Sequence, residues 1–274
     1  MRDFSIAPRE MYASLWRNRN LIKQMTRREV LGLYRGSILG LAWSFFHPIL
    51  MLAVYTFVFS VVFKARWGVG VGGEEGRANF AILVFVGMIV HSLFSECLSK
   101  APDLVLTNTN YVKKVVFPLE VLPAISLSTA LFHTTISLLV LITTIAATSQ
   151  LYWTVLLIPI VLLPLAILAI GIAWLLASMG VFIRDVGQGI GILITVMMFL
   201  SPMFYPIDAL PETIRPLIML NPLSLIMEQA RAVLVWGKMP DWQALGIYTA
   251  IACAVAWMGF AWFQKTRKGF ADVL

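Results

Sequence analysis

The sequence predicts an all-α integral membrane protein with six transmembrane helices, an interfacial amphipathic helix at its N-terminus and two short re-entrant helices between spans five and six. Two observations lead to this fold class. Hydrophobic residues make up 59% of the 274 residues and charged residues only 13%, whereas a soluble domain carries about 25% charged residues. Apolar runs long enough to cross a hydrocarbon core of about 30 Å alternate with polar connections along the whole chain.

Residues 1–37 precede the first apolar run and are predicted to be a cytoplasmic N-terminal segment. Apolar residues recur there at the period of one helix face, namely Met11, Leu15, Ile22 and Met25. Basic and amide residues fill the other faces, so the segment is too charged to cross a membrane. We expect a helix that lies in the interface with its apolar side in lipid. A solvated helix that packs on a partner is the alternative.

The transmembrane domain covers residues 38–264, with predicted spans at 38–63, 80–98, 121–148, 154–182, 189–205 and 245–263. Pro48 lies inside the first span, where it removes a backbone donor and is expected to kink the helix. The third and fourth spans are joined by only a few residues, which makes them an antiparallel hairpin. The fifth is short for a full crossing. Residues 265–274 form a cytoplasmic tail.

The segment 205–240 follows the fifth span and is rich in proline. The prolines around it forbid one continuous helix; they are Pro202, Pro206, Pro211, Pro216 and Pro222. Two stretches within it, 214–220 and 223–235, are nevertheless apolar enough to bury. Non-helical backbone at membrane depth is tolerated only where protein or a water-filled cavity covers it. The sequence therefore predicts two short helices folded back toward the membrane.

The connection 99–120 between the second and third spans is longer than a passive turn requires. It contains two adjacent basic residues, Lys113 and Lys114, and a helix can begin near Asp103. We interpret it as a segment that docks on another protein.

The distribution of basic residues predicts the orientation. Fifteen of the 21 Lys and Arg residues fall in the N-terminal segment, the connections at 99–120 and 183–188, and the tail. The positive-inside rule places these parts, and both termini, in the cytoplasm. The Gly-rich loop after the first span and the segment 205–240 then face outward.

Several function classes are excluded or disfavoured by the residues that the chain lacks. It has no GxxxxGK[ST] phosphate loop, no HExxH and no paired Cys motif. The GxGxxG at 68–73 lies between two spans rather than in a βαβ unit, so we interpret it as a flexible loop. The net charge of +7 belongs to membrane topology rather than to nucleic-acid binding. The spans contain no acid–base series of the kind that ion-driven carriers use.

Motifs in order along nearly the whole chain resemble the permease subunits of type-2 ABC exporters that move cell-surface polysaccharides such as O antigen, capsule and teichoic acid. These motifs are Arg28-Glu29, Tyr34 to Ser37, Trp43, Pro48, Tyr55, Asn110 to Lys114, Phe117 to Glu120, Arg184-Asp185, Ser201 to Pro206, Leu220 to Pro222, Arg231, and Phe270 to Asp272. The resemblance implies a homodimer of this chain in the inner membrane, with two copies of a separate ATPase subunit. ATP and Mg would bind that partner, and this chain would hold no cofactor.

The resemblance also implies roles for individual residues. Contacts that couple the chain to the ATPase are expected from Arg28, Tyr111, Lys113, Lys114, Arg184 and Asp185. An outward gate is expected from Pro206, Leu220, Asn221, Pro222 and Arg231.

A sugar polymer needs a path with aromatic faces, because the C–H faces of sugars stack on rings. Candidates in and near the first and fifth spans are Trp43, Phe46, Tyr55, Phe59, Phe199, Phe204 and Tyr205. Lipid-facing aromatics and interface belts are the ordinary alternative for each of them.

The expected function is therefore ATP-driven export of a lipid-linked polysaccharide, with O antigen as the first candidate. An exporter of the same class that carries capsule, teichoic acid, lipid or drug is the first alternative. A membrane enzyme acting on polyprenyl-linked sugars is another, although it requires acidic clusters, and each Asp-containing cytoplasmic turn here has a single acid. An ion-coupled carrier is disfavoured by the neutral spans.

Overall fold

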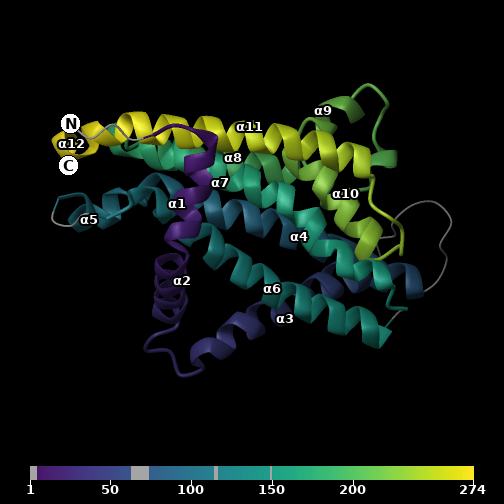
Figure 1. Cartoon of the computed structure of the whole chain (residues 1–274). Helices are drawn as coiled ribbons and strands as arrows, with labels where there is room; N and C mark the ends of the chain where they lie inside the picture. Colours follow the sequence, from purple (N-terminus) through teal and green to yellow (C-terminus); the bar gives the residue numbers. More distant parts are fainter. Residues whose placement is uncertain (1–4, 63–73, 114–116, 149) are drawn as a thin grey trace.

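The computed structural model describes residues 5–62, 74–113, 117–148 and 150–274, and every regular element in these ranges is helical (Figure 1). The α-helices are α1 (Pro8–Arg17), α2 (Arg19–Leu33), α3 (Trp43–Tyr55), α4 (Glu74–Lys100), α5 (Thr109–Lys113), α6 (Leu122–Thr148), α7 (Ile158–Phe182), α8 (Val186–Phe199), α9 (Arg215–Met219), α10 (Pro222–Leu234), α11 (Trp242–Thr266) and α12 (Phe270–Val273).

Short 3₁₀ turns and one π-helical segment connect or extend these helices. They are η1 (Gly40–Ala42), η2 (Thr56–Val62, the π-helix), η3 (Ala101–Asp103), η4 (Leu106–Asn108), η5 (Leu119–Val121), η6 (Trp153–Leu157), η7 (Ile207–Ala209) and η8 (Arg267–Gly269). The Gly-rich loop predicted at 68–73 lies outside the described residues.

Five helical stretches are long and apolar enough to cross a membrane, which confirms the multi-pass class. They are Gly40–Phe59, Phe80–Asp103, Leu119–Thr148, Trp153–Phe182 and Trp242–Val273. They overlap five of the six predicted spans, and the last of them continues ten residues beyond the predicted end at 263. The remaining predicted span corresponds to α8, which has 14 residues and a length of about 21 Å. The count of six spans therefore stays a prediction.

The N-terminal segment is two helices rather than one. The helical period breaks at Asn18, whose backbone leaves the helical region while its side chain donates to the carbonyl of Ser14 at 2.8 Å. The expectation that the face with Met11 lies in lipid was wrong. Met11 is buried, and Leu15, Ile22 and Met25 pack on the core of the chain itself. This face finds its apolar partner within the protein, and the exposed Tyr12 and Trp16 remain available to an interface.

The tightest helix pair is α7 with α11, which lie side by side along the bundle (Figure 1). Small residues permit this approach. A Cβ at Gly171 would come within 2.5 Å of the Ala256 backbone, and a Cβ at Gly259 would overlap the Gly171 carbonyl. Glycine and alanine at such contacts are typical of helices that pack in a membrane, where dispersion replaces the hydrophobic effect.

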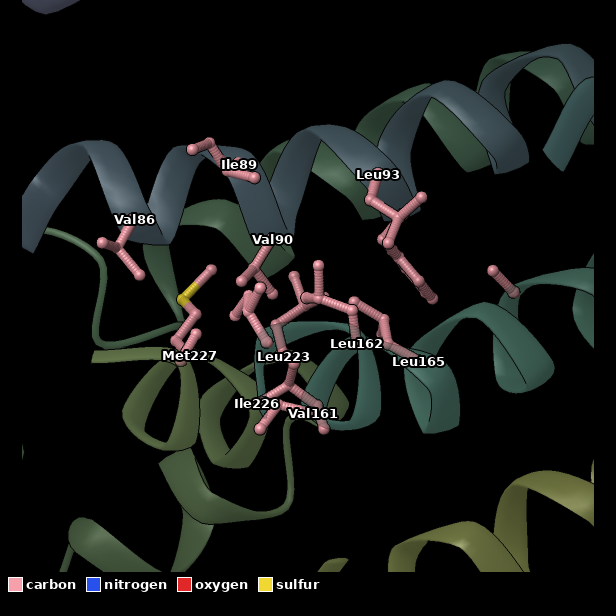
Figure 2. Packing of buried hydrophobic residues seen from close by; sticks show 14 of the residues in the cluster. Val86, Ile89, Val90, Leu93, Val161, Leu162, Leu165, Leu223, Ile226 and Met227 are labelled. Atoms are coloured by element: carbon pink, nitrogen blue, oxygen red, sulfur yellow. The ribbon is translucent and has the colours of Figure 1, made fainter. Parts of the chain in front are cut away.

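A second core joins α4, α7 and α10 (Figure 2). Val90 and Leu93 of α4 point toward Leu223 of α10 and Leu165 of α7, and all four are buried. Because α10 is only 13 residues long, this packing stabilises the helix, which would be marginal in isolation. The two short helices predicted between 205 and 240 are present as α9 and α10.

The two ends of the bundle differ in what they carry. The described N-terminal residues, α5 and α12 lie at one end, which we call the terminal end. The tip with α9 and the connection from α10 to α11 lies at the opposite end (Figure 1).

Candidate functional site

A crevice at the terminal end separates α2 from the segment 99–113. It has a volume of about 550 Å³ and is lined by Arg28 and Glu29 of α2, Lys100 at the end of α4, and Asp103 and Tyr111 beyond it. Lys100 Nζ lies 3.4 Å from a Glu29 oxygen and 3.1 Å from a Glu96 oxygen. The crevice is thus a charged hollow whose two walls are joined by one ammonium group.

A hydrogen-bonded series continues from this crevice into the bundle. Both carboxylate oxygens of Glu96 lie 2.9 Å from His133 Nδ1, and His133 Nε2 lies 3.2 Å from the Tyr34 hydroxyl. With Nδ1 donating to the carboxylate, Nε2 accepts from Tyr34. Burial and the Glu96 charge raise the pKa of Tyr34 above its ordinary value, so its hydroxyl stays protonated at neutral pH. The series connects the end of α2 to α4 and α6.

Glu120 forms a second connection at the terminal end and is buried. Its carboxylate accepts from Ser14 Oγ of α1 at 2.8 Å and from Arg267 Nη1 at 2.6 Å, while its carbonyl accepts from Trp174 Nε1 at 2.9 Å. Arg267 also donates to the Phe117 carbonyl at 2.8 Å. One carboxylate therefore ties the N-terminal helix to the start of α6 and the end of α11.

The predicted coupling residues are partly brought together. Arg28 and Tyr111 line the same crevice, and Tyr111 stacks on Phe117 with ring centroids 4.4 Å apart. Arg184 and Asp185 are exposed in the turn between α7 and α8. This turn lies near η3, because Gly180 and Gly187 both face Pro102. The coupling role of Arg184 and Asp185 stays a prediction.

The two predicted coupling lysines lie at the edge of what the structure describes. Lys113 ends α5, and Lys114 lies outside the described residues.

Aromatic side chains from distant stretches form a continuous row. Ring centroids are 6.3 Å apart between Tyr55 and Phe59, 6.1 Å between Phe59 and Phe204, and 6.4 Å between Phe204 and Phe199. Phe80 of α4 adds a neighbour 5.1 Å from Phe59. We call these five residues the aromatic row. It joins η2, α4 and the end of α8, with separations suited to weak ring–ring attraction.

The other predicted path aromatics lie outside this row. Trp43 and Phe46 form an edge-to-face pair at 5.3 Å near the start of α3, and both are exposed. The Tyr205 hydroxyl donates to the Phe199 carbonyl at 3.1 Å, which fixes the turn after α8. Of the seven candidates, four therefore belong to the aromatic row, Trp43 and Phe46 form a separate pair, and Tyr205 stabilises a turn.

Arg231 is a fully buried cation. Its guanidinium donates to the carbonyls of Leu83, Pro202 and Met203 at 3.2, 2.7 and 3.1 Å, and to Glu228 Oε1 at 2.7 Å. A buried charge needs partners of this kind, because the desolvation cost is otherwise several kcal/mol. This arrangement, which we call the Arg231 clasp, holds α10 to α4 and to the loop after α8.

The remaining gate candidates position α9 and α10. The Asn221 side chain accepts from the Leu223 amide at 3.0 Å, which caps α10, and it donates to the Met197 carbonyl of α8 at 3.0 Å. Pro222 is the first residue of α10, where a missing N–H costs nothing. Leu220 is 79% exposed, and Pro206 lies next to η7. These contacts fix the helices, and gating itself is untested.

Sequence reasoning missed the roles of four residues in these connections. His133 was not singled out. The sequence alone places Glu96 near the end of the predicted second span, where a carboxylate is less costly than at the bilayer centre, so it is interpreted as interfacial or loop-pairing. Glu120 was named only as part of a motif, and Arg267 was counted only among the basic residues that predict the orientation. Each partner is distant in sequence, so no local spacing could reveal these pairs. The single available signal was a lone ionisable residue in an apolar stretch.

Taken together, the long apolar helices, the charged crevice at one end and the folded helices at the other define a multi-pass membrane protein of the transport type. The chain matches the ABC-2 type transporter family over residues 20–235, most of its length, and belongs to that family. Among the described residues, no group of three or more His, Cys, Asp or Glu side chains is placed to hold a metal.

The chain is also similar to individual curated proteins. The chain is 29% identical over 261 residues to the O-antigen export system permease protein RfbA of Myxococcus xanthus, which covers 94% of this chain and 96% of the relative. It is 23% identical over 259 and 258 residues to two proteins of that name from Klebsiella pneumoniae, covering 93% of this chain and 95% of each relative.

Proposed function

We propose that this chain is the permease subunit of an ATP-driven exporter that moves a lipid-linked polysaccharide across the inner membrane. O antigen is the first candidate for this polysaccharide. It would act as a homodimer with two copies of a nucleotide-binding ATPase subunit, and both termini would lie in the cytoplasm. The observation that carries this proposal is the likeness to O-antigen export permeases over 93% or more of the chain.

The terminal end is the proposed site of ATPase contact. The crevice between α2 and the segment 99–113 offers a hollow of mixed charge, which can pair with charged side chains of a partner segment and so give specificity to the contact. Lys113, Lys114, Arg28 and Tyr111 would contact the ATPase there, and the exposed Arg184-Asp185 turn would provide a second contact. The series from Lys100 to Tyr34 supports this role, because it links the crevice to α4 and α6.

The aromatic row is the proposed part of the polymer path. A row of rings about 5–6 Å apart offers repeated stacking faces to successive sugars, and stacking of this kind is tolerant of the sequence of units. Trp43, Phe46 and Tyr205 are kept as further candidates. In the homodimer the exposed aromatics of α3 would face either the path or the second copy.

The opposite end is the proposed exit. We infer that α9 and α10 form a gate, with Leu220 at its exposed edge and with Pro206, Asn221, Pro222 and Arg231 holding its shape. The contacts of Asn221 with α8 and of Arg231 with α4 support this assignment, because a gate must be attached to helices that an ATPase can move.

Co-purification with the ATPase encoded nearest to this chain tests the proposal. We expect no ATP hydrolysis by the chain alone, and a stable complex whose hydrolysis responds to a lipid-linked glycan. Deletion of the gene should leave undecorated lipid A core at the surface, with polymer retained on the cytoplasmic side. A complex that responds to a different lipid or a drug would favour the same-class alternative. Failure to capture any ATPase would overturn the proposal and favour an enzyme or an ion-driven carrier.

A further inference from the structure

An open cavity of about 880 Å³ lies at the end of the bundle opposite the termini. Three connections and α10 enclose it: the link from α6 to α7 with Tyr152, the turn at η7 with Asp208, and the link from α10 to α11 with Trp236 and Lys238. Glu228 of α10 lines it as well. Its volume falls within the range of about 300–1,000 Å³ that is usual for small-molecule sites.

Two aromatic side chains form part of the wall. Tyr152 and Trp236 are 38% and 37% exposed, and both also border a smaller adjoining hollow of about 190 Å³. The place of the Tyr152 ring depends on Gly237. This glycine has a φ of +63°, and a Cβ there would come within 2.6 Å of ring atoms. The ring is therefore seated against backbone, which makes it a fixed surface rather than a mobile side chain.

The polar groups of the cavity are also held in place. Glu228 Oε1 accepts from Arg231 Nη1 at 2.7 Å, and the Glu228 side chain is 25% exposed. Pairing with a buried cation holds this carboxylate in a fixed orientation. The Asp208 carbonyl accepts from Arg215 Nη2 at 2.8 Å, and the Lys238 amide donates to the Ala232 carbonyl at 2.9 Å. Both residues thus stand on fixed turns.

This combination of groups favours a sugar over other ligands. Ring faces accept the C–H face of a pyranose, and the oriented Glu228 carboxylate and the exposed Asp208 carboxylate can accept hydrogen bonds from its hydroxyls, which are stronger than bonds between neutral groups. A phosphate head group would meet two carboxylates and one ammonium, so the net charge disfavours it. A purely apolar ligand would cover the Asp208 and Lys238 side chains without offering them a hydrogen bond.

We propose that this cavity binds sugar units of the polysaccharide as it leaves the protein on the outward side. The proposal rests on the proposed function and on the orientation that goes with it. Since Pro206 and Met219 also border the cavity, the site lies beside the proposed gate helices and not within the aromatic row. A polymer held there would be hindered from sliding back when the gate closes.

The test uses the full chain in complex with its ATPase, in nanodiscs of neutral lipid. The probe is the surface polysaccharide of the source cell, freed from its lipid by mild acid, and its affinity is measured by calorimetry. We expect Trp236→Ala and Tyr152→Ala each to weaken binding about tenfold, the loss of one stacking partner. Trp236→Phe should retain most of the affinity, and Asp208→Asn should weaken it without removing a ring.

Trp153→Ala is the matched control. This residue follows Tyr152, is 63% exposed and is not among the residues that line the cavity, so affinity should be unchanged. A melting temperature equal to that of the wild type shows that each variant is folded, and Asp208→Asn keeps the test valid if a Trp or Tyr variant is unstable.

A second measurement locates the ligand. Ala209→Cys is placed at the cavity wall and treated with a membrane-impermeant maleimide in spheroplasts. Added free polysaccharide should slow the labelling severalfold, and a cysteine at Trp153 should show no such protection. Labelling from the cytoplasmic side only would overturn the orientation and with it the inference.

The outcomes separate the two proposals. If the wild type exports polysaccharide while the ring variants bind it as tightly as the wild type does, the cavity is not a sugar site and the proposed function stands. The labelling of Ala209→Cys is repeated in nanodiscs of neutral lipid and in nanodiscs with added anionic lipid. If anionic lipid, rather than polysaccharide, slows the labelling there, the cavity is a head-group site and the inference is overturned. If the wild-type complex neither exports nor binds the polymer, the proposed function fails first.

Discussion

Among the described residues, the two ends of the bundle each hold one buried charged side chain, and these two side chains are paired in different ways. At the terminal end, Glu120 pairs with Arg267 and Ser14, which lie 147 and 106 residues away in sequence. At the opposite end, Arg231 pairs with Glu228, which lies only three residues away, and also donates to three backbone carbonyls. The first arrangement fastens separate helices together, whereas the second fixes the path of the backbone.

This difference indicates what each end can do. Side-chain pairs between helices can be exchanged or broken one at a time, which suits a region that transmits movement from a partner. A guanidinium that satisfies several carbonyls must keep all of them or lose much of its stabilisation. We therefore expect the loop after α8, the start of α4 and α10 to move as one body if the gate opens.

Removal of the buried cation should have the largest effect on stability. Arg231→Met deletes the clasp and leaves three carbonyls and the Glu228 carboxylate without their donor. We expect a loss of about 3–5 kcal/mol in the free energy of unfolding, measured by chemical denaturation in detergent. Arg215→Met is the control, because that half-buried residue binds only two carbonyls of one loop. Equal losses for the two variants would contradict the special role of the clasp.

Removal of the buried charge at the terminal end should lower the free energy of unfolding by a smaller amount. Glu120→Gln keeps the shape and one acceptor but removes the charge opposite Arg267, whose side chain is 13% exposed. We expect a loss of about 1.5–3 kcal/mol, together with faster hydrogen exchange in α1, because Ser14 loses an ionic acceptor. Glu10→Gln alters the surface pair with Arg17, and a comparable loss there would mean that burial is not the cause, since surface pairs contribute about 0–1 kcal/mol.

The same contrast explains how much was predictable from sequence. The long apolar helices follow from composition and period, and α9 and α10 follow from where Pro216 and Pro222 permit a helix to begin. The break at Asn18 and the inward direction of Met11 did not follow, because an amphipathic period does not say whether protein or lipid covers the apolar face. The pairing of Glu120 with Arg267 and of Glu96 with His133 could not be predicted, since tertiary packing alone brings these residues together.

A charge reversal in the crevice should affect coupling rather than stability. Arg28→Glu alters an exposed residue at the crevice wall, so the free energy of unfolding should change by less than about 0.5 kcal/mol. If the ATPase docks there, the complex should dissociate more readily, and export should fall together with glycan-stimulated hydrolysis. The paired change Lys113→Glu with Lys114→Glu should act in the same direction. Normal export by both variants would remove the terminal end from the proposed contact.

The smallest effect on stability is expected at the edge of the opposite end. Leu220 is 79% exposed, so truncation to Ala removes almost no buried area and leaves the Arg231 clasp intact. If α9 and α10 form a gate whose closure depends on apolar contact between the two copies of the dimer, Leu220→Ala should let small solutes leak. Leakage is measured by the release of a dye from proteoliposomes without ATP.

Leu217→Ala is the matched variant, since Leu217 is also exposed and lies in α9. Leakage from Leu220→Ala alone would place the seal at the end of α9, and leakage from both would extend the seal along that helix. Tight vesicles in both cases would mean that the gate closes through the backbone that Arg231 holds, in which case the fixed end of the molecule would itself be the barrier.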